Sequence, residues 1–79
     1  MPALLLLNVF RFFFYSNKNN EPLHVHVTKG DAYGKIWLEP VVIIVYLVGF
    51  TRAEIKDINE IVITHLEQFK TRWHEHFNQ

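Results

Sequence analysis

The chain has 79 residues, 49% of them hydrophobic and 15% aromatic, and its eight basic and eight acidic side chains give a net charge of zero. This length fits a single domain, residues 1–79, with enough apolar material for a core and too little charge imbalance for strong electrostatic binding of nucleic acid. The sequence contains no cysteine, which excludes disulfides, thiolate metal sites and a cysteine nucleophile.

Two apolar segments resemble targeting sequences only in their composition. The segment 3–15 follows no basic region and is interrupted by Asn8 and Arg11, which argues against a signal peptide. The segment 41–50 is about half as long as the roughly 20 residues of a membrane-spanning helix. We therefore expect a soluble, cytoplasmic protein with no membrane partner.

The N-terminal half has the composition of a β-sheet. Four segments fit β-strands: residues 3–7, 10–16, 23–29 and 35–39. Turn-forming residues fill 17–22 and 30–34, and the short connections favour antiparallel pairing of neighbouring strands. The apolar, β-branched segment 41–48 fits a strand or a buried helical turn equally well.

The C-terminal half has the pattern of a helix. Thr51 and Glu54 have the spacing of a capping box, in which each side chain bonds a backbone amide of the first turn. Apolar residues then recur every three or four positions: Ile55, Ile58, Val62, Leu66, Phe69, Trp73 and Phe77. We predict an α+β fold, with a four-stranded, mainly antiparallel β-sheet packed by one long C-terminal amphipathic helix.

This helix is long for the sheet that it covers. A helix over residues 52–77 would span about 39 Å, whereas strands of this length span roughly 17–24 Å. Either the helix bends, or its C-terminal residues Phe69, Trp73 and Phe77 pack against a partner. We favour the partner interpretation, because contiguous exposed apolar patches usually mark interfaces.

His24 and His26 form the clearest candidate site, because residues i and i+2 of a strand point to the same side. In a strand over 23–29 the two imidazoles would stand side by side, with Val25 and Val27 facing the core. Such a pair can supply a general base and a general acid near neutral pH. The plainer interpretation is that both histidines are half-exposed polar positions of a strand with one hydrophobic side.

RNA cleavage without a metal suits this pair, because the 2′-hydroxyl of the substrate can serve as the nucleophile. Arg11 or Lys29 would hold the phosphate, and Tyr15 would stack on a base. Nucleophilic catalysis by the protein fits less well, since Ser16 is the only serine and lies outside a G-x-S-x-G motif.

A metal would need His24, His26 and a third ligand, for which His76, Glu75 and Glu21 are the candidates. His74 cannot join His76 in binding one ion, because the two side chains diverge by about 200° on a helix. The chain has no H-E-x-x-H motif and no thiolate. We therefore expect no metal and no cofactor.

Five motifs carry a family resemblance: "RFFFYSN", "EPLHVHV", "WLEP", "GFTRAEI" and a terminal "WHEHF". Their order and spacing resemble a family of small bacterial proteins catalogued as domain of unknown function 4160. The resemblance implies a place in a two-protein operon of toxin–antitoxin type, and therefore a protein partner. The chain departs from the family pattern at Leu23, where relatives often have proline, and at 41–48, where relatives carry polar residues.

Three functional hypotheses follow. The leading one is a toxin–antitoxin-type module component that acts by binding a protein partner, either a further copy of itself in a homo-oligomer or a cognate small protein from the same operon. The first alternative is a metal-independent endoribonuclease that uses His24 and His26, with RNA as its substrate. The second alternative is a module that binds a metal through histidines or binds nucleic acid.

Overall fold

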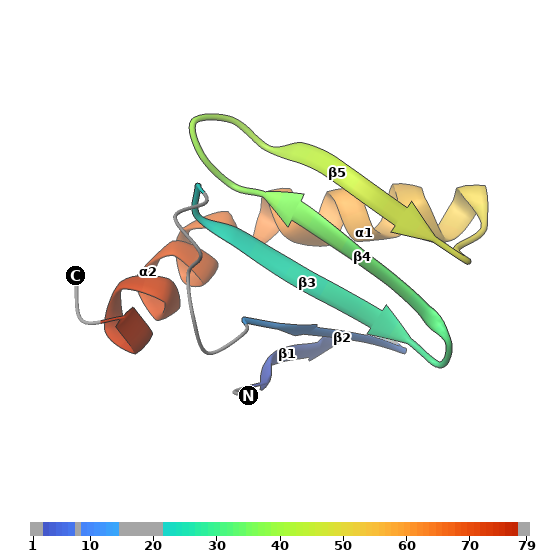
Figure 1. Ribbon diagram of the computed structural model, residues 1–79, viewed down its shortest axis with the longest axis horizontal. Helices are drawn as coiled ribbons and strands as arrows, with labels where there is room; N and C mark the ends of the chain where they lie inside the picture. Colours follow the sequence, from blue (N-terminus) through green and yellow to red (C-terminus); the bar gives the residue numbers. More distant parts are fainter. Residues whose placement is uncertain (1–2, 8, 15–21, 78–79) are drawn as a thin grey trace.

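The computed structural model describes residues 3–7, 9–14 and 22–77. In chain order the elements are β1 (Ala3–Leu7), β2 (Phe10–Phe13), β3 (His24–Lys29), β4 (Ala32–Trp37), β5 (Ile43–Val48), α1 (Arg52–Thr64) and α2 (Leu66–Phe77). The strands form one sheet, with α1 running behind β4 and β5 and α2 lying at the end where β3 begins (Figure 1).

The sheet is an antiparallel meander in which five strands lie in the order β1-β2-β3-β4-β5. The predicted α+β class and the antiparallel pairing are confirmed, and all four predicted strands are present. The segment 41–48, which the sequence left open, supplies the additional strand β5. Four boundaries differ from the prediction, since β2 ends at Phe13, β3 begins at His24, and β4 begins earlier, at Ala32, and ends at Trp37. The β3–β4 turn is tighter than expected and consists of Gly30 and Asp31 alone, with Gly30 at a φ of 57°.

The core lies between the helices and one face of the sheet. Strand alternation sends Phe10, Phe12, Val25, Val27 and Ile36 to this face, and all five are buried. The helices contribute the buried residues Ile58, Val62, Phe69 and Trp73. The predicted apolar stripe is therefore the core-facing side of both helices.

The start of α1 matches the prediction from the sequence. The Glu54 amide donates to the Thr51 hydroxyl at 3.1 Å, and the Thr51 amide donates to Oε1 of Glu54 at 2.9 Å. This capping box satisfies amides that the first helical turn leaves without partners. Within the described residues, neither helix has the length and apolar character that crossing a lipid bilayer requires.

The prediction of one long helix is wrong, because α1 ends at Thr64 and α2 begins at Leu66. His65, at φ −105° and ψ 18°, lies between them, although its amide still donates to the Ile61 carbonyl and its carbonyl accepts from Phe69 at 3.0 Å. The molecule measures 35 Å in its longest dimension, less than the roughly 39 Å of an unbroken helix over 52–77. The bend therefore keeps the stripe on the sheet.

The bend also corrects the expected interface at the C-terminal end. Phe69 and Trp73 are 0% and 4% exposed, so they belong to the core of this chain and offer no surface to a partner. Phe77 is half-buried, with its ring centroid 4.4 Å from that of Trp73 and 6.2 Å from that of Phe14. The length mismatch seen in the sequence is resolved by bending.

Candidate functional site

His24 and His26 lie on the side of β3 opposite Val25 and Val27, as predicted. Their ring centroids are 5.2 Å apart, with the rings nearly perpendicular. The expectation that both are half-exposed is wrong, because only 4% of His24 and 7% of His26 remain accessible. Strand β3 is thus buried on both sides at this end, and we call His24, His26, Phe13 and Trp73 the histidine cluster.

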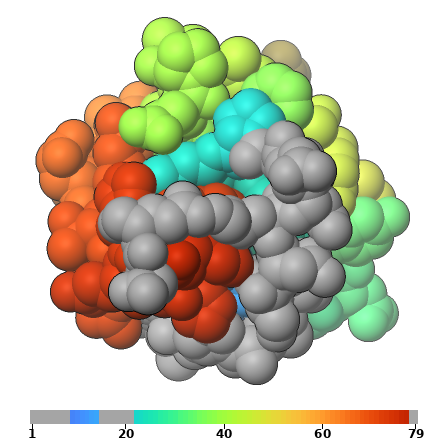
Figure 2. Space-filling model, turned by 60° about the vertical axis from the view of Figure 1, so that its left-hand side comes forward, coloured from blue at the N-terminus to red at the C-terminus, as the bar shows by residue number. Residues whose placement is uncertain are grey.

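His24 is held by one hydrogen bond and one ring contact. Its Nδ1 lies 2.8 Å from the carbonyl oxygen of Pro22, and because a carbonyl only accepts, Nδ1 carries the proton. In the neutral ring Nε2 is then the basic nitrogen. The indole of Trp73 lies 5.2 Å away between ring centroids, and Figure 2 shows the start of β3 (cyan) beside α2 (red).

His26 connects to Arg11 through an aromatic ring. Phe13 stands opposite His26 in the β2–β3 register, and the two rings stack at 5.6 Å with an interplanar angle of 24°. The guanidinium of Arg11 lies 4.8 Å from the centroid of the same Phe13 ring, within cation–π range. The three residues proposed for catalysis, Arg11, His24 and His26, therefore share one side of the sheet. Two imidazoles and one cation therefore lie on the same side of the sheet, with little of either imidazole open to a substrate.

Of the residues proposed for ligand binding, Trp73 contacts His24, whereas Lys29 is engaged elsewhere. Lys29 forms an ion pair with Oε2 of Glu54, so its charge is matched within the fold. The hydrogen bond from Lys29, followed by the backbone hydrogen bond from Thr51, lowers the pKa of Glu54 below its ordinary value. Tyr15, proposed to stack on a base, lies outside the described residues.

The possible third ligands of a metal do not join His24 and His26 where the structure describes them, and Glu21 lies outside the described residues. Among the residues that the structure describes, no three histidine or carboxylate side chains are placed to hold one ion. His76 lies on α2 with its ring centroid 6.2 Å from that of Phe14, and His74 is exposed. The set of His24, His26 and His76 is therefore not assembled.

Strand β5 is a second candidate site, and its residues were not among those predicted from the sequence to form a site. Among the described strands it pairs only with β4 and forms one edge of the sheet. Ile43, Ile44, Val45, Tyr46 and Val48 are each 39–44% exposed. The signal in the sequence was the uncharged run from Pro40 to Thr51, which a buried segment would have explained equally well.

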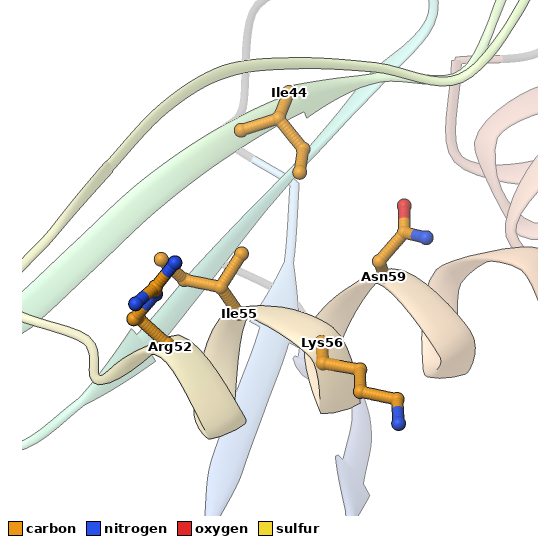
Figure 3. A pocket seen from close by; sticks show the side chains of 5 residues that line it. All are labelled: Ile44, Arg52, Ile55, Lys56 and Asn59. Atoms are coloured by element: carbon orange, nitrogen blue, oxygen red, sulfur yellow. The ribbon is translucent and has the colours of Figure 1, made fainter.

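A groove lies between this edge and the first turns of α1. It has a volume of about 470 Å³ and is lined by Ile44, Arg52, Ile55, Lys56 and Asn59. Ile55 and Asn59 point toward Ile44, whereas the Lys56 side chain points away from it (Figure 3). The groove therefore has an apolar centre, and its charged groups lie at its border.

Comparison with known proteins identifies a family for the chain. The model of a family described as "Domain of unknown function (DUF4160)" matches residues 10–74. This match includes β2 to β5, α1 and most of α2. Neither the curated proteins nor the solved structures contain a match to the chain.

Proposed function

Because the chain belongs to the family described as domain of unknown function (DUF4160), whose description carries no activity, we propose a function from the geometry: the protein works by binding another protein chain along β5. The observation that carries the proposal is the exposed, uncharged edge strand Ile43–Val48. The edge of a sheet presents unpaired amides and carbonyls that a further strand can join.

Protection of this edge is slight. Native sheets shield their edges with charged side chains, prolines, bulges or covering segments, and β5 contains neither a charge nor a proline. Its pairing with β4 contains one bulge, at Val45, between the pairs Lys35–Tyr46 and Ile36–Ile44. An apolar strand that stays about 40% exposed at five of its positions favours a partner that covers it.

The identity of the partner is suggested by the family resemblance. A component of a two-protein operon of toxin–antitoxin type would bind the product of the adjacent gene. The edge of β5 is the surface to which that product would add a strand. Alternate residues of an added strand would enter the groove beside Ile44 and Ile55.

Co-purification with the adjacent gene product tests this function. Native mass spectrometry should detect a stable complex with the wild-type chain and with Val9→Lys, a matched change at an exposed residue outside β5. Val45→Lys should abolish the complex, because a buried interfacial lysine without a partner is costly. A complex that tolerates Val45→Lys would refute binding through β5.

The endoribonuclease stays a second candidate because His24 and His26 lie 5.2 Å apart between ring centroids. Burial of both rings argues against it. The decisive assay is RNA cleavage in the presence of a chelator, using wild type and the variants His24→Gln and His26→Gln, with circular dichroism to verify folding. Cleavage that depends on both histidines would support the enzyme, and cleavage unchanged in both folded variants would exclude it.

A further inference from the structure

We propose that the chain occupying β5 is a second copy of this protein, so that two sheets join across a two-fold axis into one continuous antiparallel sheet. This inference rests on the proposed function, since it concerns the same edge: a second copy covers β5 in the protein alone, and the product of the adjacent gene would displace that copy. Three features of β5 carry it: its charge, the side to which each residue points, and the charged groups at its two ends.

The first feature is the lack of charge. Residues 40–51 contain no acidic or basic side chain, so an antiparallel pair of β5 strands brings no like charges together in any register. Like charges directly opposite each other destabilise a strand pair, and most edge strands avoid self-pairing by carrying them. Strand β5 lacks this protection against its own copy.

The second feature is the bulge. Since Val45 is the additional residue between Ile44 and Tyr46, both Ile44 and Leu47 lie on the helix side of the sheet, opposite Ile36 and Gly34. Ile43 and Val48 lie on the other side, opposite Trp37 and Tyr33.

A two-fold axis between Val45 and Tyr46 consequently sets Ile44 against Leu47 of the second copy, and Ile43 against Val48. Each of these four residues then meets one on its own side of the sheet, as pairing requires. Without the bulge, Ile44 and Leu47 would lie on opposite sides, and this centred arrangement would fail.

The third feature is charge complementarity at the ends of the strand. Glu39 and Arg52 are the charged residues that border the run 40–51, and in the sequence they are the same number of positions from the midpoint of β5. Both are exposed. Oε2 of Glu39 also lies 3.9 Å from Nζ of Lys70. The two-fold arrangement brings Glu39 of each copy toward Arg52 of the other. It also carries Leu47 of the second copy toward the groove beside Ile44 (Figure 3).

The experiment is a mass measurement of the purified chain alone, by light scattering and native mass spectrometry over a concentration series. We expect wild type and Val9→Lys to reach about twice the chain mass of 9.4 kDa at micromolar concentrations. Val45→Lys should weaken the dimer at least about tenfold with an unchanged circular dichroism spectrum. A folded monomer at all concentrations, or a dimer that tolerates Val45→Lys, would overturn the proposal.

Charge reversal tests the register. Glu39→Lys and Arg52→Glu should each weaken the dimer, and the double variant should recover it, because the two side chains face each other across the axis. Failure of the double variant to recover would overturn the two-fold register.

The two proposals fail separately. A monomeric chain that still forms a Val45-dependent complex with the adjacent gene product would refute the homodimer and leave the proposed function intact. A chain that stays monomeric in both experiments would refute both.

Discussion

His24 shows how a polar side chain becomes part of a buried surface. Its Nδ1–H donates to the Pro22 carbonyl, and the rest of the ring packs against Trp73 and His26. A buried polar group is tolerated when it has a hydrogen-bond partner, and within the described residues no buried side-chain nitrogen or oxygen lacks one. The ring is therefore a structural element of the fold.

Replacing this ring should cost stability. We expect His24→Ala to lower the free energy of unfolding by about 2–4 kcal/mol, because it removes buried ring contacts and a hydrogen bond. The matched change His74→Ala, at an exposed residue of α2, should stay within about 0.5 kcal/mol of wild type. Urea unfolding at one protein concentration measures both, and equal effects would contradict a buried structural role for His24.

Glu54 serves two elements with its two oxygens. Oε1 accepts from the Thr51 amide at the start of α1, and Oε2 pairs with Lys29 at the end of β3. Both interactions favour the charged carboxylate and lower its pKa in the folded state. The stabilisation is therefore present above the ordinary value of 4.5 and is lost as the pH falls through the lowered folded-state pKa.

The direction of this pKa shift predicts how the stabilisation by Glu54 changes with pH. The stability difference between wild type and Glu54→Gln should be largest near neutral pH and should shrink toward zero as the medium becomes strongly acidic. Thermal unfolding from pH 7 to pH 2 measures it. Lys29→Met should reduce the same difference, because it removes the first cause of the lowered pKa. A difference that grows on acidification would contradict this assignment.

Among the elements, β5 depends on a close approach to β4 at Gly34. A Cβ atom there would lie 2.2 Å from Cδ2 of Leu47 and 2.8 Å from the backbone oxygen of Tyr46. The leucine side chain can rotate away, but the Tyr46 oxygen belongs to the strand itself. Gly34 therefore permits β5 to sit where it does.

We expect Gly34→Ala to destabilise the fold by about 1–3 kcal/mol and to loosen β5 first. The control is Gly30→Ala, where a Cβ meets nothing within 4 Å but the φ of +57° disfavours a side chain. Its cost should stay near 1 kcal/mol, about the penalty for that backbone region. Hydrogen exchange of the β5 amides distinguishes the two variants, since accelerated exchange is expected for Gly34→Ala and not for Gly30→Ala.

Elements with strong local signals were predictable from the sequence. The pair Thr51 and Glu54 predicts the start of α1, and the alternation around Val25 and Val27 predicts both the strand and the side that faces the core. The break at His65 was not predictable, because no glycine or proline marks it and the apolar stripe continues through it. It follows from the limited length of the sheet, which is a tertiary constraint.

The candidate site was likewise predictable from the sequence only in part. Adjacency of His24 and His26 follows from strand geometry alone, so the sequence predicts it. Their burial depends on Trp73, about fifty residues away, and on the stacking of Phe13, which no local pattern contains. The exposure of β5 could not be predicted from the sequence either, since an apolar run indicates a buried segment unless its place at the edge of the sheet is known.

At the scale of the whole molecule, the two helices cover one face of the sheet and leave the edge at β5 accessible (Figure 1). The acidic residues Glu54, Asp57, Glu60, Glu67 and Glu75 all belong to the helices, so the helical layer is charged while the β5 edge is not. This contrast gives the molecule one charged layer suited to solvent and one uncharged edge.

Association through β5 should appear in thermal stability. We expect the Tm of wild type to rise with protein concentration, because a dimer is stabilised by mass action. Val45→Lys should have a Tm that depends less on concentration than that of wild type, and Val9→Lys should behave as wild type. Scanning calorimetry over a hundredfold concentration range measures all three, and identical concentration dependence in wild type and Val45→Lys would contradict the assignment.

The strand order has a kinetic consequence. Each pairing of the meander joins strands that follow one another along the chain, so the sheet assembles by closing short hairpins, with no search between distant segments. Such local topologies fold quickly, because closing a short loop costs little conformational entropy before the stabilising contacts form. Two connections, from Leu7 to Phe10 and from Lys29 to Ala32, join paired residues only three positions apart, which makes these two hairpins, the second with His24 and His26 already adjacent on it, the natural nuclei of folding.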